Sequence, residues 1–262
     1  MTAVPSQPNI FVAYWLFSLD PAYHRLAPSV QNQGKEEFLS ELDTRPQSIT
    51  LRGTYSLAGL RSDADLMLWI YAPNLDDIQN LAISLRQTSL GGYLRPVETY
   101  VGVVAPARYD PGHQPAFMSG AAPKNYISVY PFVKTSDWYL LPYEKRRELM
   151  AEHGQVGRRY AVPRDQLTGS EDSATHTYGN SMTAQATSST AVAEGGGVLS
   201  NTVDAFGLGD YEFILANESD DPSELCRMME SLRKVEVRRY TQLDTPIFLA
   251  RLRTPAEAID AL

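Results

Sequence analysis

Four side chains in the middle of the chain have the chemistry to bind iron or to move electrons and protons. They are Tyr130, Lys134, Trp138 and His153. A neutral imidazole is a good ligand for iron, and a single histidine suffices to hold haem iron. A phenol can pass on one electron and one proton when a strong oxidant lies nearby. A helical pattern begins near Pro142, and Gly154 directly follows His153, which predicts that this histidine lies in the last turn of a helix.

Each of these side chains also has an ordinary structural explanation. The helix dipole favours a histidine at a helix end as a cation. A tyrosine at a strand end can fill the core and hydrogen-bond its hydroxyl, and a tryptophan is more often a core residue than a redox partner. A lysine is usually a solvated cation. Residue type alone therefore leaves both explanations open at all four positions.

The segments around these positions form an ordered combination. They read Tyr130-Pro-Phe-Val-Lys134, Asp137-Trp-Tyr-Leu-Leu-Pro142 and Glu152-His-Gly-Gln-Val-Gly-Arg-Arg-Tyr160, and the pattern continues through 198–203, 210–213 and 232–240. This combination resembles the chlorite-dismutase-like family, and within it the branch that converts coproheme to haem b with hydrogen peroxide. The resemblance covers nearly the whole chain apart from a Ser/Thr-rich insertion, and the combination is far more specific than any one segment.

The resemblance implies a role for each of the four side chains. His153 matches the family's proximal iron ligand, so it is the expected metal ligand. Tyr130 matches the catalytic tyrosine, which becomes a radical beside the reactive propionates of the porphyrin. Lys134 matches a basic residue near those propionates. Trp138 matches an aromatic residue near the proximal side, where it is expected to pack beside the cofactor.

Two further site residues follow from the same resemblance. His113 matches the distal histidine of the actinobacterial type, where it would act as a general base toward peroxide. The alternative for His113 is a loop histidine exposed to solvent. Arg233 is expected to bind a propionate, because a guanidinium matches a carboxylate with a two-pronged fork. Other candidate cations of this kind are Arg158, Arg159, Arg238 and Arg239.

The activity that the resemblance implies is a peroxide-dependent oxidative decarboxylation. Two propionates of Fe-coproporphyrin III (coproheme), which is both substrate and redox centre, become vinyl groups, and the product is haem b. Hydrogen peroxide is the expected co-substrate, a ferrochelatase is the expected supplier of coproheme, and a homopentamer is the expected oligomer.

Two other functions stay open at this point. The first is chlorite dismutase or a general haem peroxidase. Ser200 stands near the position where chlorite dismutase carries a distal arginine, so a cation for a hypochlorite-like intermediate is missing. The second is a haem-binding carrier or sensor that keeps His153 and performs no chemistry. Tyr130 argues against a carrier, which needs no oxidisable phenol at that place.

The elements that must position these residues repeat along the chain. Residues 65–77 and 210–221 each have the pattern of an apolar strand and an acidic turn, and each leads into an amphipathic helix. The expected elements around them are strands at 11–17, 49–55, 97–104, 126–133, 198–206 and 246–252 and helices at 35–42 and 142–153. The order βαββαβ, found twice, predicts an α+β fold: a duplicated ferredoxin-like unit of the dimeric α+β barrel type, with antiparallel sheets and outer helices.

The same pattern predicts how the chain is divided. We expect an N-terminal ferredoxin-like half over 1–108, a linker over 109–124 that carries His113, and a C-terminal haem-binding half over 125–262. The stretch from about 163 to 197 is rich in Ser, Thr, Gly and Ala. It is expected to be a flexible insertion, because it cannot bury enough apolar surface to offset the entropy of ordering.

Composition limits the classes of partner. The formal net charge of -8 argues against nucleic acid or an anionic membrane surface as the main partner. Cys226 is the single cysteine, so no intramolecular disulfide is possible, and it is expected to pack as a small hydrophobe. No signal-peptide pattern and no apolar stretch long enough to span a bilayer are apparent, which predicts a cytoplasmic protein.

Overall fold

The computed structural model describes residues 9–104, 114–163 and 197–262. The strands are β1 (Phe11–Leu19), β2 (Thr50–Ser56), β3 (Leu66–Ala72), β4 (Leu94–Val103), β5 (Tyr126–Lys134), β6 (Leu199–Asp204), β7 (Phe213–Ser219), β8 (Thr241–Leu243) and β9 (Phe248–Arg253). The α-helices are α1 (Pro28–Asp43), α2 (Leu75–Gln87), α3 (Ser136–Leu140), α4 (Tyr143–Arg158), α5 (Pro222–Leu232) and α6 (Pro255–Asp260). Short 3₁₀ helices are η1 (Tyr23–Arg25), η2 (Gly91–Tyr93), η3 (Ala116–Ser119) and η5 (Glu236–Tyr240).

The strands form one nine-stranded antiparallel sheet with the order β7-β6-β4-β1-β3-β2-β9-β5-β8. Because β5 also pairs with β7, the sheet closes on itself. The first half has the spatial order β4-β1-β3-β2, and the second half has the equivalent order β9-β5-β7-β6. The two halves thus repeat one ferredoxin-like arrangement, which confirms the predicted fold class.

Two seams join the halves into the closed sheet. At one seam, β2 pairs with β9 over three residue pairs, from Thr54↔Arg253 to Ser56↔Arg251. At the other, β4 meets β6 at the single pair Val103↔Asp204. Beside that pair, Gly102 lies so close to Val203 that a side chain at position 102 would collide with it. The absence of a side chain there lets the two strands approach.

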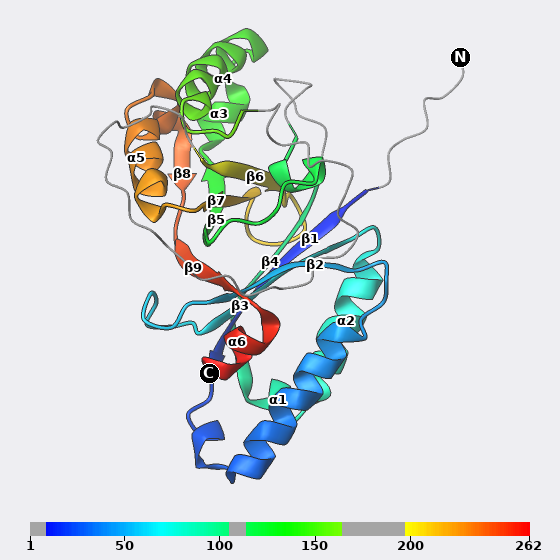
Figure 1. Ribbon diagram of the computed structural model, residues 1–262. Coiled ribbons are helices and arrows are strands. Elements are labelled where there is room, and N and C mark those ends of the chain that lie inside the picture. Colours follow the sequence, from blue (N-terminus) through cyan, green and yellow to red (C-terminus); the bar gives the residue numbers. More distant parts are fainter. Residues whose placement is uncertain (1–8, 105–113, 164–196) are drawn as a thin grey trace, which may run out of the picture.

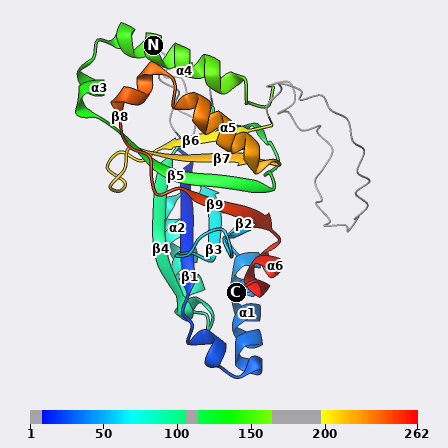
Figure 2. The same cartoon turned by 90° about the vertical axis from the view of Figure 1, so that its left-hand side faces the viewer.

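The long helices cover the outer faces of the sheet. Figure 1 shows α1 and α2 against the N-terminal half and α3, α4 and α5 against the C-terminal half. Figure 2 shows α5 lying between α4 and the strands β6, β7 and β5. The side chains of Asn74 and Asp221 cap α2 and α5 by accepting hydrogen bonds from backbone N–H groups in the first turn. Both strand–turn–helix repeats therefore form as the sequence predicts.

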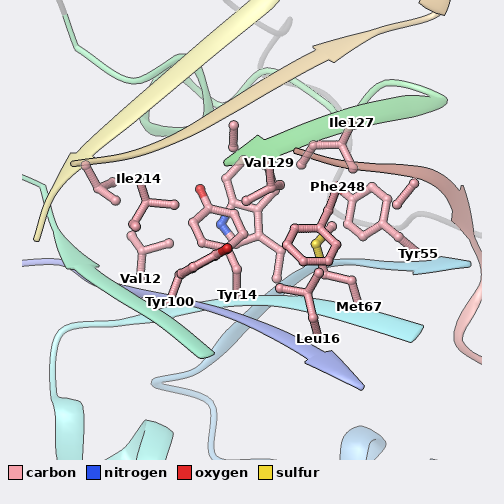
Figure 3. Close-up of a cluster of buried hydrophobic side chains, with 14 of the residues drawn as sticks. Val12, Tyr14, Leu16, Tyr55, Met67, Tyr100, Ile127, Val129, Ile214 and Phe248 are labelled. Carbon is pink, nitrogen blue, oxygen red and sulfur yellow. The ribbon is translucent and has the colours of Figure 1, made fainter. Parts of the chain in front are cut away.

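The interior of the closed sheet is filled by side chains from both halves. Strand residues such as Tyr14 and Tyr100 from the first half meet Val129, Ile214 and Phe248 from the second (Figure 3). Their fractional exposures are at most 1%. Burial of such large apolar side chains contributes about 1.5–3 kcal/mol each, so this shared core holds the two halves together.

One buried ion pair crosses between the halves. Nη2 of Arg52, on β2, lies 2.7 Å from Oε1 of Glu218, on β7. Glu218 also accepts hydrogen bonds from Asn201 Nδ2 and from the backbone N–H of Lys124. The guanidinium lies 4.8 Å from the centroid of the Trp69 ring. Burial raises the pKa of Glu218, and the nearby Arg52 guanidinium opposes that rise.

Several details differ from the sequence-based expectations. Helix α4 continues past Gly154 to Arg158, and the short helices α3 and α6 are additional. Cys226 is exposed on α5 and does not pack as a core hydrophobe, because Leu225 and Met228 form the inward face of that helix. In the segments that the structure describes, no helix has the length and apolar character to traverse a bilayer.

Candidate haem-binding site

Alternation along β5 gives Tyr130 its direction. Its neighbour Val129 points into the shared interior core, so Tyr130 points to the opposite, helix-covered face of the sheet. Tyr130 pairs with Leu215 on β7, and Ser128 pairs with Asn217. Cross-strand partners point to the same face. These four side chains therefore lie together beneath the helices of the C-terminal half.

Two polar contacts hold the phenol of Tyr130. Nδ2 of Asn217 donates a hydrogen bond to the Tyr130 hydroxyl at 3.4 Å. The hydroxyl in turn donates to Sδ of Met229, on α5, at 3.5 Å. Tyr130 is 3% exposed, and its burial raises the pKa of the phenol to about 12, with the Asn217 hydrogen bond acting in the opposite direction. The side chain is therefore a neutral phenol at physiological pH.

A charged cluster lies beside this phenol. Nη1 of Arg233, directly after α5, lies 2.6 Å from Oδ2 of Asp244, and Nη2 of Arg238 lies 3.5 Å from the same oxygen. Both Arg233 and Asp244 are close enough to Tyr130 to influence its pKa, which Asp244 raises and Arg233 lowers. The structure thus brings Arg233 and Tyr130 into one site.

Lys134 and Trp138 form a second group at the end of β5. Nζ of Lys134 lies 4.2 Å from the centroid of the Trp138 ring and 5.3 Å from that of Phe132. Such placements are attractive because the faces of aromatic rings are electronegative. Burial lowers the pKa of the Lys134 ammonium to about 8, and the negative charge of Glu212 acts in the opposite direction. Trp138 is buried and also packs against Tyr240.

His153 lies on the inward face of α4. Leu149, His153 and Val156 are spaced by four and then three residues along the chain, so they share one face of this helix. Leu149 and Val156 pack in a cluster with Trp138. The imidazole of His153 is half-buried on this same face of the helix.

The structure corrects one expectation about His153. The prediction that this histidine lies in the last turn is wrong, because the helix continues past Gly154. The expected proximity to Tyr130 stays a prediction; α5 packs against both α4 and β5. His153 and Tyr130 thus lie on the same, helix-covered side of the sheet.

The remaining predicted cations are placed less centrally. Arg158 and Arg159 are exposed at the end of α4. His113 lies outside the described residues. Beside α4 runs a groove of about 490 Å³, lined by Glu152, Arg233, Lys234, Val235, Glu236, Arg238 and Arg239. Its basic side chains outnumber its carboxylates, which suits an anionic ligand.

The sheet face beneath α4 and α5 has the features that a flat iron-porphyrin needs. Thr202 is exposed, and Ser200 and Leu215 are partly exposed, although β6 and β7 lie within the closed sheet. This face thus offers an uncovered strip beside the Tyr130 phenol. The inward-facing His153 supplies an imidazole donor, and a single histidine is a sufficient protein ligand for haem iron. The residues present therefore fit such a group.

The sequence does not predict the residues that contact the expected site residues. Asn217 and Met229 contact the Tyr130 hydroxyl, Asp244 pairs with Arg233, and Glu212 lies beside Lys134. A signal existed for Asn217, because a polar residue within an apolar strand needs a hydrogen-bond partner when it is buried. No sequence signal indicates that Met229 or Asp244 reaches this site.

A family profile and a relative of known activity both match most of this chain. The profile of the family described as chlorite dismutase matches residues 31–171 and 186–253. The coproheme decarboxylase of Mycolicibacterium smegmatis is 34% identical over 246 residues, which cover 92% of this chain and 90% of that protein.

Solved structures agree in fold. The chlorite dismutase of Candidatus Nitrospira defluvii in complex with imidazole superposes with a TM-score of 0.75 at 20% identity, covering 97% of this chain and 95% of that one. A mutant of the same enzyme gives a TM-score of 0.75 at 20% identity, covering 96% and 94%. At this identity the likeness shows the fold alone. The match to the chlorite dismutase profile and the identity with the decarboxylase relative show that the chain belongs to the chlorite dismutase family.

Proposed function

We propose that this protein is an oxidoreductase that uses hydrogen peroxide to convert coproheme to haem b. The observation that carries the proposal is the buried phenol of Tyr130, which Asn217 and Met229 hold between the sheet and helix α5. The coproheme decarboxylase relative supports the choice of substrate. A carrier or sensor needs no oxidisable side chain held in this way.

The reaction balances with one peroxide for each propionate. A propionate, one hydrogen peroxide and one proton give a vinyl group, carbon dioxide and two waters, and coproheme undergoes this change twice. The propionate side chain is oxidised by two electrons, and the peroxide is reduced by two. When bound, the iron-porphyrin with peroxide supplies the oxidising power.

The protein's own residues place the substrate and move the proton and electron. His153 is the proposed iron ligand, and Trp138 is proposed to pack beside the porphyrin. Lys134 and Arg233 are proposed to bind propionates, the latter with its guanidinium fork. Tyr130 enters the reaction as a neutral phenol, so it gives up its electron together with the proton on Oη. His113 is the proposed general base toward peroxide.

Chlorite dismutation fits this chain less well. Ser200, at the approximate position of that enzyme's distal arginine, pairs with Asn217 and so lies on the proposed site's face of the sheet. A serine hydroxyl cannot supply the positive charge that would stabilise a hypochlorite-like intermediate.

The cellular setting is part of the proposal. We propose a cytoplasmic homopentamer that receives coproheme from a ferrochelatase. We also propose a division of the chain. It has two halves at 1–108 and 125–262, a linker at 109–124 and an insertion near 163–197.

Titration of the coproheme complex with peroxide tests the function. Mass spectrometry should show two successive losses, each of one carboxyl group and one hydrogen.

Tyr130→Phe should bind coproheme yet stall before the first loss, because phenylalanine has no phenolic hydrogen to give. His153→Ala should change the absorption spectrum of the bound iron.

Tyr126→Phe is the matched control, because Tyr126 lies on the same strand and face but outside the contacts of Tyr130. It should retain both losses. Normal turnover by Tyr130→Phe, or bleaching of coproheme by the wild type without the two losses, would contradict the proposal.

A further inference from the structure

Glu212 lies at a junction of the sheet next to the proposed site. Its backbone N–H donates to the carbonyl of Phe132 at 3.3 Å, and its carbonyl accepts from the N–H of Ala205 at 2.8 Å. These bonds fix Glu212 to β5 on one side and to the end of β6 on the other. The position of its backbone is therefore set by the sheet.

The carboxylate of Glu212 joins two further segments through one oxygen. Oε2 accepts the backbone N–H of Lys134 at 2.7 Å and the hydroxyl of Tyr139 at 2.5 Å. Hydrogen bonds to an ionised carboxylate are stronger than those between neutral groups. Glu212 thereby links the end of β5 to α3, the helix that carries Trp138.

Aromatic packing supports the same link. The Tyr139 ring lies 6.2 Å from Phe206, which lies 5.1 Å from Phe213. Phe213 directly follows Glu212 and lies 6.4 Å from Phe132. The Tyr139 ring is thus held by packing while its hydroxyl is held by the carboxylate, and α3 cannot shift without disturbing both.

Glu212 also differs from the other charged groups around Lys134. The titratable side chains on the elements packed against Lys134 are Asp137, Tyr139, Glu212, Glu236, Arg238, Arg239 and Tyr240. Within the described part of the chain, Glu212 is the group whose charge raises the pKa of Lys134 against the effect of burial. Its carboxylate therefore favours the charged ammonium that lies over the Trp138 ring.

We propose that Glu212 is a positioning residue, which holds the Lys134 backbone and helix α3 and so places the Lys134 ammonium over the Trp138 indole for carboxylate binding. The carboxylate-binding part of this inference rests on the proposed function. The placement and the charge of Lys134 can be tested without any porphyrin.

The ligand-free test is a pH titration of Trp138 fluorescence. Subtracting the emission of Trp138→Phe removes the signal of the two other tryptophans, Trp15 and Trp69. The Trp138 emission should change with a midpoint near pH 8, as the ammonium above the ring loses its proton, and Lys134→Met should abolish the change. Glu212→Gln should lower the midpoint by about one pH unit, the low end of the effect of a neighbouring charge.

Glu236→Gln is the matched control, because it removes the same charge from an exposed position on η5. Its midpoint should stay at the wild-type value. A wild-type midpoint in Glu212→Gln overturns the proposal. Should Glu212→Gln fail to fold, Glu212→Asp keeps the charge but shortens the side chain, and unchanged coproheme affinity in that variant overturns it.

A double-variant comparison tests the action through Lys134. Glu212→Gln should weaken coproheme binding at pH 8. The double variant Glu212→Gln with Lys134→Met should bind coproheme only slightly more weakly than Lys134→Met alone. Independent, additive losses would overturn the proposal. If the wild type binds coproheme but does not decarboxylate it, the proposed function fails, whereas the fluorescence titration still decides the role of Glu212.

Discussion

Lys134 shows how a single side chain can lower stability for the sake of binding. Burial holds its pKa at about 8, below the ordinary 10.5 of lysine, so the folded protein retains an ammonium that is poorly solvated. The aromatic faces of Trp138 and Phe132 offset part of that loss. A carboxylate of the substrate would supply a further negative charge beside that of Glu212.

Lys134→Met should stabilise the ligand-free protein by about 1–3 kcal/mol at pH 7 while weakening coproheme binding. The folded-state pKa lies below the unfolded one, so the cost of the charge is fully present below pH 8 and disappears as the pH rises toward 10.5. Chemical denaturation at pH 7 and at pH 10 measures this. A stabilisation that is equal at both pH values would contradict the assigned cause.

At the scale of elements, the two strand–turn–helix repeats could be predicted because their signals are local. An apolar run, an acidic turn and a capping side chain at Asn74 or Asp221 all lie within a few residues. The partners of Tyr130 could not be predicted in this way. Asn217 and Tyr130 are 87 residues apart in the sequence, and strand register alone brings them together.

The glycines of helix α4 also show where prediction from local sequence patterns fails. Gly154 resembles a helix stop, but the packing of Leu149 and Val156 carries the helix onward to Arg158. Gly157 lies one turn after His153 on the same face, and a side chain there would meet nothing within 4 Å. The space beside the imidazole is therefore open on this side.

Gly157→Ala should stabilise the ligand-free protein by about 0.5–1 kcal/mol, because glycine in a helix is less favourable than alanine. The same methyl group should weaken coproheme binding, because it projects into the space beside His153. Denaturation and spectroscopic titration measure the two effects. Gly154→Ala is the comparison, since its Cβ would lie 3.3 Å from the flexible end of Arg158. Unchanged affinity in Gly157→Ala would show that the porphyrin does not approach this turn.

At the scale of the whole molecule, Arg52 and Glu218 connect the two halves inside the closed sheet. The Glu218 side chain is 0% exposed and that of Arg52 is 5% exposed. A buried charge is tolerated only when it is paired. The pair therefore ties the register of β2 to that of β7, two strands from different halves.

Arg52→Met should destabilise the protein by about 3–5 kcal/mol at pH 8, because it leaves the Glu218 carboxylate buried without its cation. The folded-state pKa of Glu218 is already raised, so protonation favours the folded state and the penalty should shrink as the pH falls toward 5. Denaturation across this pH range measures the effect. Adding Glu218→Gln should recover most of the loss; a penalty that is independent of pH would contradict the explanation.

The seam at Gly102 is narrow, so the closed sheet is easier to open there. The closed sheet is joined between β4 and β6 through the single residue pair Val103↔Asp204. If thermal motion separated that pair, both strands would present free backbone donors and acceptors to other molecules. Aggregation on heating is thus expected to begin where β4 and β6 part.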